Sequence, residues 1–446
     1  MLPLLLLAGC MLPWDPAWNT TDADDSAPAD DSADTGPSII EVSGSIVGDT
    51  TWTPDNIYVL QELVFVEGST LLTIEPGTTV QGVSGSALVV TREASLLARG
   101  HADAPIVFTS DQPEGSRAPG DWGGVVLLGD APVNQLPAQI EGVPASDSRG
   151  AYGGSDANGT CGTLEYVRIE FAGFEVFANN DLNGLTLGGC GASTIVRYVQ
   201  VHRGFDDGVE LFGGTADLRN ILITQAGDDS IDWDQGWTGR AQFVIAQQAP
   251  DDGDHGIEAD NNEDGVDLEP RSAPTLYNLT ILGSGNPDIA QRGILLRLGT
   301  AGTLRNVIVA GSTTELLDIR DEATVAQIDG GALTIDNLIA FDIGASGADF
   351  FRPETGADDD DGGFDEEGWL TSVDLNIRLG TDPGLPPAAF DLAAPDFVPA
   401  VNGAAATGAA SPPEGEFWDQ AATYIGAVRP GTATPWYAGW TAFPED

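Results

Sequence analysis

The sequence predicts an all-β solenoid of the parallel β-helix class, and three observations support this. Short β-branched and aliphatic runs, separated by glycine and aspartate, fill the chain from residue 39 onward, and no 3.6-residue periodicity is sustained. One six-residue phrase recurs, for example at Leu276–Ile281 and Leu304–Val309. A second phrase repeats after 22, 26 and 37 residues, and a period in the low twenties, lengthened by inserted loops, suits three short strands per turn. A β-propeller, with four strands per blade and a longer period, ranks second.

Each copy of the first phrase predicts a strand of about six residues. The copies are Leu164–Ile169, Val196–Val201, Leu218–Ile223, Leu276–Ile281, Leu304–Val309 and Ile335–Ile339. Equivalent residues of successive turns stack in a solenoid. The asparagines that the phrase repeats are therefore expected to form a ladder at one corner: Asn220, Asn278, Asn306 and Asn337.

The second phrase places acidic residues at equivalent positions of successive turns. Its copies are Phe205–Glu210, Gly227–Asp232, Gly253–Glu258 and Gln291–Leu295. Neighbouring strands of a sheet lie about 4.8 Å apart, so aligned side chains are close. The alignment predicts one column of Asp207, Asp229, His255 and Arg292, and beside it a second column of Asp206, Asp228, Asp254 and Gln291.

Stacked carboxylates repel one another, so this pattern requires compensation. A bound Ca²⁺ ion, which prefers six to eight oxygen ligands, is one solution, and a protonated carboxyl with a raised pKa is another. The candidate calcium ligands are Asp206, Asp207, Glu210, Asp228, Asp229, Asp232, Asp234 and Asp254. The plainer alternative is that these aspartates lie on solvated turns and cap backbone N–H groups. Arg292 and Arg297 are candidates either for substrate binding or for neutralising the column.

The charge composition excludes several functions. The chain has 446 residues and a formal net charge of −52, and all of its 17 basic residues are arginine. Nucleic-acid binding is excluded because no basic stripe is present, and a lysine-dependent phosphate loop is impossible. The three histidines, His101, His202 and His255, are too few for a histidine-based metal centre.

The N-terminus predicts export and membrane anchoring. Residues Leu2–Cys10 resemble the end of a bacterial lipoprotein signal peptide, and Leu7–Cys10 are similar to a lipobox, which implies acylation of Cys10. Residues 11–38 contain seven aspartates and no basic residue, which predicts a disordered acidic tether. After residue 10, no uncharged apolar run is long enough to span a bilayer.

The expected domain organisation follows from these segments. Residues 1–10 form the signal segment, 11–38 the tether and 39–446 one β-helix domain, in which 39–80 are the N-terminal cap and first coils and 381–446 are the C-terminal cap. Residues 111–160 are expected to form long loops. Cys161 and Cys190 form an even pair in an oxidising compartment, which favours a disulfide; two free thiols or a metal pair are the alternatives.

Several further motifs carry a resemblance. They are Thr51–Trp52, Leu72–Thr78, Asp121–Gly124, Ile140–Gly142, Tyr152–Gly154, Asp207–Gly214, Gly227–Asp234, Tyr424–Ala427 and Trp436–Trp440. Over about residues 39–446, the chain resembles a family of bacterial outer-membrane lipoproteins and type IX secretion cargo with a pectin-lyase-like fold. The resemblance implies a right-handed parallel β-helix that is surface-exposed at the outer membrane or secreted. It implies no established reaction.

A looser resemblance concerns the order of the acidic residues. Polygalacturonase-type glycosidases carry Asn-Thr-Asp, Asp-Asp, His-Gly and Arg-x-Lys on successive coils. Here the corresponding coils offer Phe205–Asp207, Asp228–Asp229, His255–Gly256 and Leu295–Arg297. The Asn-Thr pair is absent, and the basic pair of Arg-x-Lys is reduced to Leu-x-Arg. The resemblance implies catalytic roles for Asp207, Asp228, Asp229 and His255, in which one carboxyl protonates the leaving oxygen and another activates water.

Two functions follow as expectations. The leading one is a lipid-anchored cell-surface β-helix that acts as a binding, adhesion or structural module, with calcium as a candidate stabilising ion and a glycan or surface protein as partner. The alternative is a polysaccharide-cleaving enzyme, an inverting glycoside hydrolase or a lyase, that uses the stacked aspartates. The oligomeric state is left open.

Overall fold

The computed structural model describes residues 36–177, 180–353, 360–372 and 374–446. The chain divides into two units, Met1–Gly36 and Pro37–Asp446, and the second contains every strand and helix named below. The signal segment with Cys10, and nearly all of the acidic tether, lie outside the described residues.

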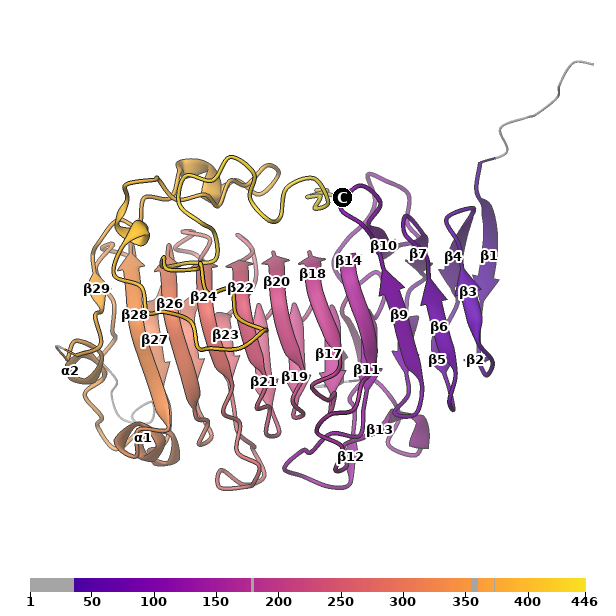
Figure 1. Ribbon diagram of the computed structural model, residues 1–446, viewed down its shortest axis with the longest axis horizontal. Helices are drawn as coiled ribbons and strands as arrows, with labels where there is room; N and C mark the ends of the chain where they lie inside the picture. The colour runs from indigo at the N-terminus through magenta and orange to yellow at the C-terminus, as the bar shows by residue number, and fades with distance from the viewer. Residues whose placement is uncertain (1–35, 178–179, 354–359, 373) are drawn as a thin grey trace, which may run out of the picture. The chain divides into compact units, whose positions relative to one another are not determined.

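The Pro37–Asp446 unit is a coil of parallel strands whose walls are two long sheets (Figure 1). Sheet A, with 15 strands, contains β1 Ser38–Val42, β3 Thr50–Trp52, β4 Asn56–Leu60, β6 Leu71–Ile74, β7 Thr79–Gly82, β9 Ser95–Arg99, β10 Ile106–Ser110, β14 Gly162–Glu170, β18 Ile195–His202, β20 Asp217–Thr224, β22 Arg240–Gln247, β24 Thr275–Leu282, β26 Gly302–Ala310, β28 Leu333–Phe341 and β29 Arg378–Leu379. Sheet B, with 10 strands, contains β2 Ser45–Ile46, β5 Leu63–Val66, β8 Ala87–Val90, β11 Val125–Leu128, β17 Leu185–Gly188, β19 Val209–Phe212, β21 Ile231–Asp234, β23 His255–Ala259, β25 Arg292–Leu296 and β27 Glu315–Ile319.

Each of the first turns of the coil has three separate strands. From β14 onward, two of the three are continuous and form one longer, bent strand. Strand β9 pairs with the first half of β14, up to Glu165, and β10 pairs with the second half, from Val167. Tyr166, between the halves, has a left-handed φ of 51° that bends the strand. The fold is therefore the right-handed parallel β-helix predicted from the sequence.

The core lies inside the coil because alternate residues of each strand point inward. Val209 and Leu211 of β19 stack on Ile231 and Trp233 of β21, and all four belong to one buried cluster that runs through the turns. Burying such a side chain contributes on the order of 1.5–3 kcal/mol, so each added turn stabilises its neighbours.

The bend at Tyr166 recurs and forms the predicted ladder. The residues at this position, all with φ between 51° and 64°, are Tyr166, Tyr198, Asn220, Phe243, Asn278, Asn306 and Asn337. Asparagine tolerates a left-handed backbone better than most residues, which explains its repetition here. Three of the asparagine amides also bind carbonyl groups of the C-terminal segment: Asn278 binds Tyr424, Asn306 binds Ala410 and Asn337 binds Gly408.

Two additional pieces cover the outer face of sheet B. Residues 129–160 contain β12 Ala138–Gln139, the 3₁₀ turn η1 Ser148–Gly150 and β13 Ala151–Tyr152, which pairs with β12. Val133, Ile140 and Tyr152 of this cover loop pack on Val126 and Phe212 of sheet B. A hairpin of β15 Phe174–Phe177 and β16 Asn180–Leu182 follows β14.

The C-terminal segment differs from the expected cap. The side chains of Phe350, Phe364 and Trp369 pack on the main core, as do side chains of the helices α1 Glu322–Asp329, which follows β27, and α2 Glu366–Leu370, which follows β28. Residues 381–446, with η2 Pro387–Phe390 and η3 Ala404–Ala406, instead lie on the outer face of sheet A (Figure 1). The segment needs this face because its Phe397 and Tyr437 become buried against Leu222, Ile245 and Leu282.

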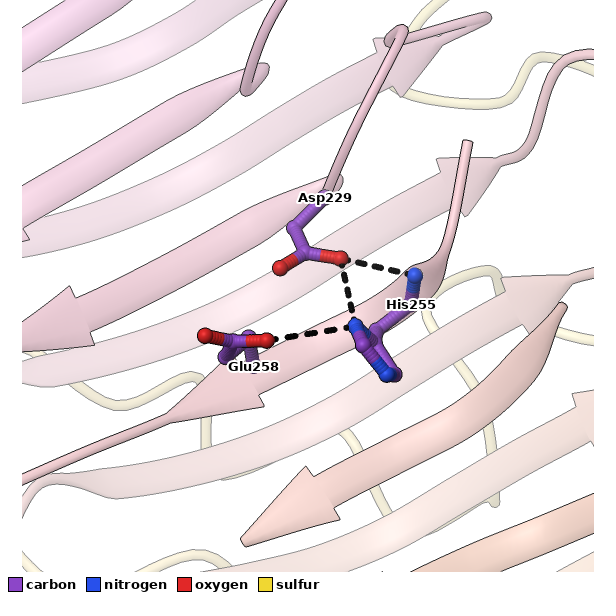
Figure 2. Close-up of side chains that lie close together, drawn as sticks. All are labelled: Asp229, His255 and Glu258. Carbon is purple, nitrogen blue, oxygen red and sulfur yellow. Dashed lines mark hydrogen bonds and ion pairs between the residues drawn. The ribbon is translucent and has the colours of Figure 1, made fainter. Parts of the chain in front are cut away.

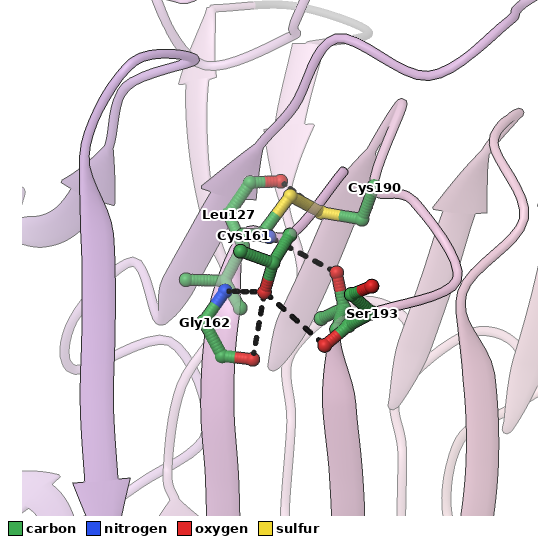
Figure 3. Close-up of a disulfide and its surroundings, with 7 residues drawn as sticks. Leu127, Cys161, Gly162, Cys190 and Ser193 are labelled. Atoms are coloured by element: carbon green, nitrogen blue, oxygen red, sulfur yellow. Dashed lines mark hydrogen bonds between the residues drawn. A yellow bond between two sulfur atoms is a disulfide. The ribbon is translucent and has the colours of Figure 1, made fainter. Parts of the chain in front are cut away.

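The predicted disulfide forms between Cys161 and Cys190 (Figure 3). Their Cα atoms lie 5.6 Å apart, within the usual range for a disulfide. Both residues are buried in the main core, and the backbone N–H of Cys161 donates to Thr194 Oγ1 at 3.0 Å. The bond therefore fastens two neighbouring turns from the inside.

Candidate functional site: a buried acidic column

The acidic residues of the second phrase lie at the start of successive sheet B strands. Val209 pairs with Ile231, Ile231 with Ile257, and His255 with Arg292. This register places Asp207, Asp229, His255 and Arg292 at equivalent positions, as the sequence predicts. Asp206, Asp228 and Asp254 precede them by one residue.

A small residue, glycine or serine, follows each of the first three members of the column, because the backbone there lies directly against core side chains. A Cβ atom added to Gly208 would lie 2.3 Å from Ile223, and one added to Gly256 would lie 2.2 Å from Ile281. The chain therefore passes against the core at this point and turns its acidic side chains outward. From there, Glu210, Asp232 and Glu258 project from the outer face of sheet B in direct register.

The aspartates of the column hydrogen-bond to the next turn. Asp207 Oδ1 accepts from the backbone N–H of Asp229 at 2.9 Å, and Asp229 Oδ1 accepts from that of His255 at 2.7 Å. The expectation that these aspartates cap backbone N–H groups is therefore met, but the expectation of solvated turns is wrong. Asp207 and Asp229 are only 6% and 4% exposed, because the side chains of neighbouring turns enclose them.

His255 is the centre of one cluster of the column (Figure 2). Its Nδ1 lies 2.8 Å from Asp229 Oδ1 and 3.3 Å from Glu258 Oε2, while Nε2 faces Asp254 Oδ1 at 3.6 Å. Burial lowers the pKa of His255, although Asp254 and Glu258 oppose this change. The three residues Asp229, His255 and Glu258 offer ligand atoms within 4.8 Å of one another.

Arg292 and Arg297 neutralise the half of the column formed by β23, β25 and β27. Arg292 Nε lies 2.9 Å from Glu315 Oε1, and its Nη1 lies 3.3 Å from Asp254 Oδ1. Arg297 Nε lies 2.8 Å from Asp260 Oδ1, and its Nη2 contacts Glu258. Both guanidinium groups are thus held by carboxylates of the protein itself, which supports the neutralising role over substrate binding.

The other half, on β19 and β21, has no such neutralisation. In the described part of the chain, no arginine lies within ion-pair distance of its five carboxylates, Asp206, Asp207, Glu210, Asp228 and Asp232. They form two groups whose ligand oxygens lie within 4.8 Å of one another, and Asp207 belongs to both: Asp206, Asp207 and Asp228 in one, and Asp207, Glu210 and Asp232 in the other.

Burial and mutual repulsion raise the pKa values of this half. Burial raises the pKa of Asp206 to about 8, and Glu141, Asp181 and Asp228 add to the change. The pKa values of Asp207, Glu210 and Asp232 are also raised well above their usual values, first by burial and then by neighbouring carboxylates. The ionised forms are therefore unfavourable unless a cation joins them.

The residues that cover this half were not predicted from the sequence. Glu141 of the cover loop and Asn183, which precedes β17, meet Glu210: Asn183 Nδ2 donates to Glu141 Oε1 at 3.1 Å and also to Glu210. Nothing in the repeat could place Glu141, because it lies 42 residues from Asn183 within a long loop. Glu258 was available in the sequence, since it aligns with Glu210 and Asp232.

The remaining candidate ligands are less central. Asp254 belongs to the neutralised half through Arg292. Asp234, at the end of β21, accepts from the backbone N–H of Gln235, and burial raises its pKa to about 7.

These features define a parallel β-helix protein with a buried, partly neutralised acidic column on one sheet. Residues 44–349, more than half of the chain, match the family model described as a pectate-lyase like beta helix domain, and the chain belongs to this family. The comparisons with curated proteins and with solved structures found no match. Among the described residues, no helix has the length and hydropathy needed to cross a membrane.

Proposed function

We propose that the protein is a lipid-anchored, calcium-dependent binding module of the bacterial cell surface. The observation that carries this proposal is the half of the column on β19 and β21, where five carboxylates approach one another and no arginine of the described residues pairs with them. A hard divalent cation is the partner that such oxygens require. Two buried oxygens without a hydrogen-bond partner in the described structure, Asp232 Oδ1 and Asn183 Oδ1, support the same conclusion.

The geometry favours cation binding over inverting hydrolysis. The oxygens of Asp206, Asp207 and Asp228 lie within 4.8 Å of one another, which is a spacing that ligands of a single ion adopt. Inverting hydrolysis needs carboxyl groups about 6.5–9.5 Å apart, so that a water molecule fits between them and the sugar.

An ion bound by Asp206, Asp207 and Asp228 would also be accessible to a partner from the solvent. Asp228 is exposed and Asp206 is half-buried, whereas Asp207 is buried. Three carboxylates supply only part of the six to eight oxygens that Ca²⁺ takes. Hydroxyl or carboxylate oxygens of a glycan would complete the coordination from the solvent side. In this proposal the glycan is the partner, and the cation makes its binding calcium-dependent.

The cation is tested by thermal unfolding and by calorimetric titration with CaCl₂ after treatment with chelator. A hundredfold excess of Ca²⁺ over its Kd stabilises the folded state by about 2.7 kcal/mol. Asp232→Asn is expected to raise the melting temperature in chelator, because it removes repulsion, and to reduce the gain on adding Ca²⁺. The exposed Asp288→Asn serves as the matched control and should leave both values unchanged. A melting temperature that neither Ca²⁺ nor chelator moves would falsify the calcium role.

Glycan binding is tested by retention on immobilised neutral and acidic polysaccharides in Ca²⁺ and in chelator. We expect retention only in Ca²⁺, and we expect Asp228→Asn to abolish it without unfolding the protein. Equal retention in Ca²⁺ and in chelator would show that glycan binding does not depend on a cation in the acidic column.

The anchor is proposed from Cys10 and the residues around it. Growth with an alkyne-labelled fatty acid should label the wild-type protein and leave Cys10→Ala unlabelled, with the variant released from the outer-membrane fraction. Equal labelling of both proteins would contradict acylation at Cys10.

Polysaccharide cleavage is the second candidate, and one observation favours it. Asp207, Asp229 and His255 stand on three adjacent turns in the order found in polygalacturonase-type enzymes, with the exposed Asp228 beside them. Release of new sugar ends from a polysaccharide panel tests it, with Asp229→Asn and Asp228→Asn compared with Asp288→Asn. Activity that both column variants abolish would establish an enzyme.

A further inference from the structure

A second polar pocket lies on the other sheet, between the outer face of sheet A and the C-terminal segment. It encloses about 230 Å³. Four aromatic side chains line it: Tyr198 on β18, Phe243 on β22, and Tyr424 and Trp436 from the C-terminal segment. Phe243, Tyr424 and Trp436 pack together in one apolar cluster. The pocket therefore has an aromatic wall built from segments that are distant in sequence.

Two arginines line this pocket, and in the described structure neither has a carboxylate within 4.0 Å. The Arg219 guanidinium lies 5.8 Å from the centre of the Phe243 ring, and its Nη1 donates to the carbonyl of Phe417. Arg429 lies 5.9 Å from the centre of the Tyr424 ring. In a chain with 69 acidic and 17 basic residues, two such guanidinium groups beside one aromatic cluster leave a local excess of positive charge.

Asn220 supplies an independent polar group. It occupies the ladder position at which Asn278 and Asn306 bind the C-terminal segment. Asn220 is only 5% exposed and lines the pocket, yet its side chain makes no hydrogen bond within the described residues. The Asn220 amide is therefore open to the pocket and can hydrogen-bond to a ligand there.

The single acidic residue of the pocket has another role. Asp419 Oδ1 accepts from the backbone N–H of Ala421 at 2.9 Å, and the backbone N–H of Asp419 donates to Gln242 Oε1 at 2.8 Å. These bonds hold the turn of the C-terminal segment against β22. Two arginines against one aspartate leave the pocket suited to an anion.

We propose that this pocket binds a single six-membered ring that carries a carboxylate. The carboxylate would receive charge-assisted hydrogen bonds from Arg219 and Arg429, and the ring would stack on the aromatic wall. The pocket is smaller than the ~300–1,000 Å³ typical of drug-sized ligands, which suits one ring rather than a chain of them. The site is separate from the acidic column and does not depend on calcium.

Calorimetric or NMR titration with four probes tests the proposal. Glucuronate and benzoate combine a ring with a carboxylate, glucose has only the ring, and acetate has only the carboxylate. We expect both ring carboxylates to bind at least about tenfold more tightly than glucose and acetate. Tighter binding of glucuronate than of benzoate identifies a sugar acid as the natural ligand, and the reverse order identifies an aromatic acid. Glucose or acetate binding as tightly as the ring carboxylates, or no binding of any probe, overturns the proposal.

Variants assign the binding to this pocket. Arg429 is exposed, and within the described structure its side chain makes only a 3.5 Å hydrogen bond to the carbonyl of Ala421, so Arg429→Gln should fold normally. We expect it to weaken ring-carboxylate binding about tenfold or more, with the same result for Arg219→Gln. Arg92→Gln, outside the pocket, is the matched control, and Asp232→Asn should also bind normally. Unchanged affinity in both arginine variants contradicts the assignment.

Discussion

Asp229 Oδ1 accepts a hydrogen bond from the backbone N–H of His255 at 2.7 Å and lies 2.8 Å from Nδ1 of the same residue. One carboxylate oxygen thus joins two adjacent turns of sheet B through both the main chain and the side chain of a single residue. Asp229→Ala leaves the buried backbone N–H of His255 without a partner and leaves its Nδ1 with only the longer contact to Glu258, so it should lower the free energy of unfolding by about 1–3 kcal/mol. Denaturant unfolding measures this, with the exposed Asp288→Ala as control; a loss no larger than that of the control contradicts the structural role of the pair.

His202 predicts a loss of stability at acidic pH. Its Nδ1 lies 2.7 Å from Thr224 Oγ1, and its Nε2 lies 2.8 Å from the carbonyl oxygen of Pro444, close to the end of the chain. Burial lowers its pKa from 6.5 to about 4. Because the folded protein holds this imidazole neutral, its contribution is complete above pH 6.5 and is lost as the pH falls towards 4.

The shift corresponds to about 3 kcal/mol. We therefore expect the difference in stability between the wild type and His202→Gln to shrink by roughly this amount between pH 7 and pH 4. Denaturant unfolding at each pH measures the difference. A difference that is independent of pH would show that His202 does not titrate with this pKa.

The disulfide should contribute strongly to stability. Cys161 and Cys190 close a loop across a separation of 29 residues. Restricting the unfolded chain in this way stabilises the folded state by about 3.6 kcal/mol in the chain-entropy model. The double variant Cys161→Ala, Cys190→Ala should lose this amount in denaturant unfolding. Reductant should destabilise the wild type and leave the double variant unaffected.

The asparagine ladder holds the C-terminal segment, and Asn306 is its clearest member. Its side chain donates to the carbonyl of Ala410 at 2.9 Å and accepts from the N–H of the same residue at 2.8 Å. Its φ of 60° lies in the left-handed region. Asn306→Gly keeps this backbone conformation but removes both bonds, whereas Asn306→Ala also introduces strain of about 1–2 kcal/mol.

Both variants should increase proteolysis of the C-terminal segment, and Asn306→Ala should be the less stable of the two. Limited proteolysis with mass spectrometry and denaturant unfolding check these outcomes. Equal protection of the segment in the wild type and in both variants would contradict the role of Asn306 in holding it.

The repeating part of the fold could be predicted because each turn solves the same packing problem. Inward β-branched residues, a small residue after the acidic positions and asparagine at the bend recur at equivalent places of successive turns, although inserted loops change the interval between copies. The columns of Asp207 and Asn220 therefore followed from aligning the copies of each phrase. The disulfide was predictable because the spacing of its cysteines is close to one turn.

The parts that fold onto the coil could not be predicted in the same way. Glu141 reaches Asn183 through a long loop whose path depends on where Ile140 and Tyr152 find apolar surface, which no repeat encodes. The aromatic residues near the C-terminus need burial, but the sequence does not show whether they cover the end of the coil or one of its faces. They were therefore predicted to belong to an end cap. Trp440 packs edge-on against the stacked rings of Tyr166 and Tyr198, a contact that depends on the whole path of the segment.

The path of the C-terminal segment affects how the molecule comes apart. In a simple solenoid each turn contacts only its neighbours, so the ends can fray one turn at a time. Here one stretch of chain contacts β28 through Asn337, β24 through Asn278 and β18 through Gln200. Loss of an end turn therefore also loosens turns far along the coil. Mechanical pulling from the C-terminus would first peel this segment away, and only then unwind the turns beneath it one by one.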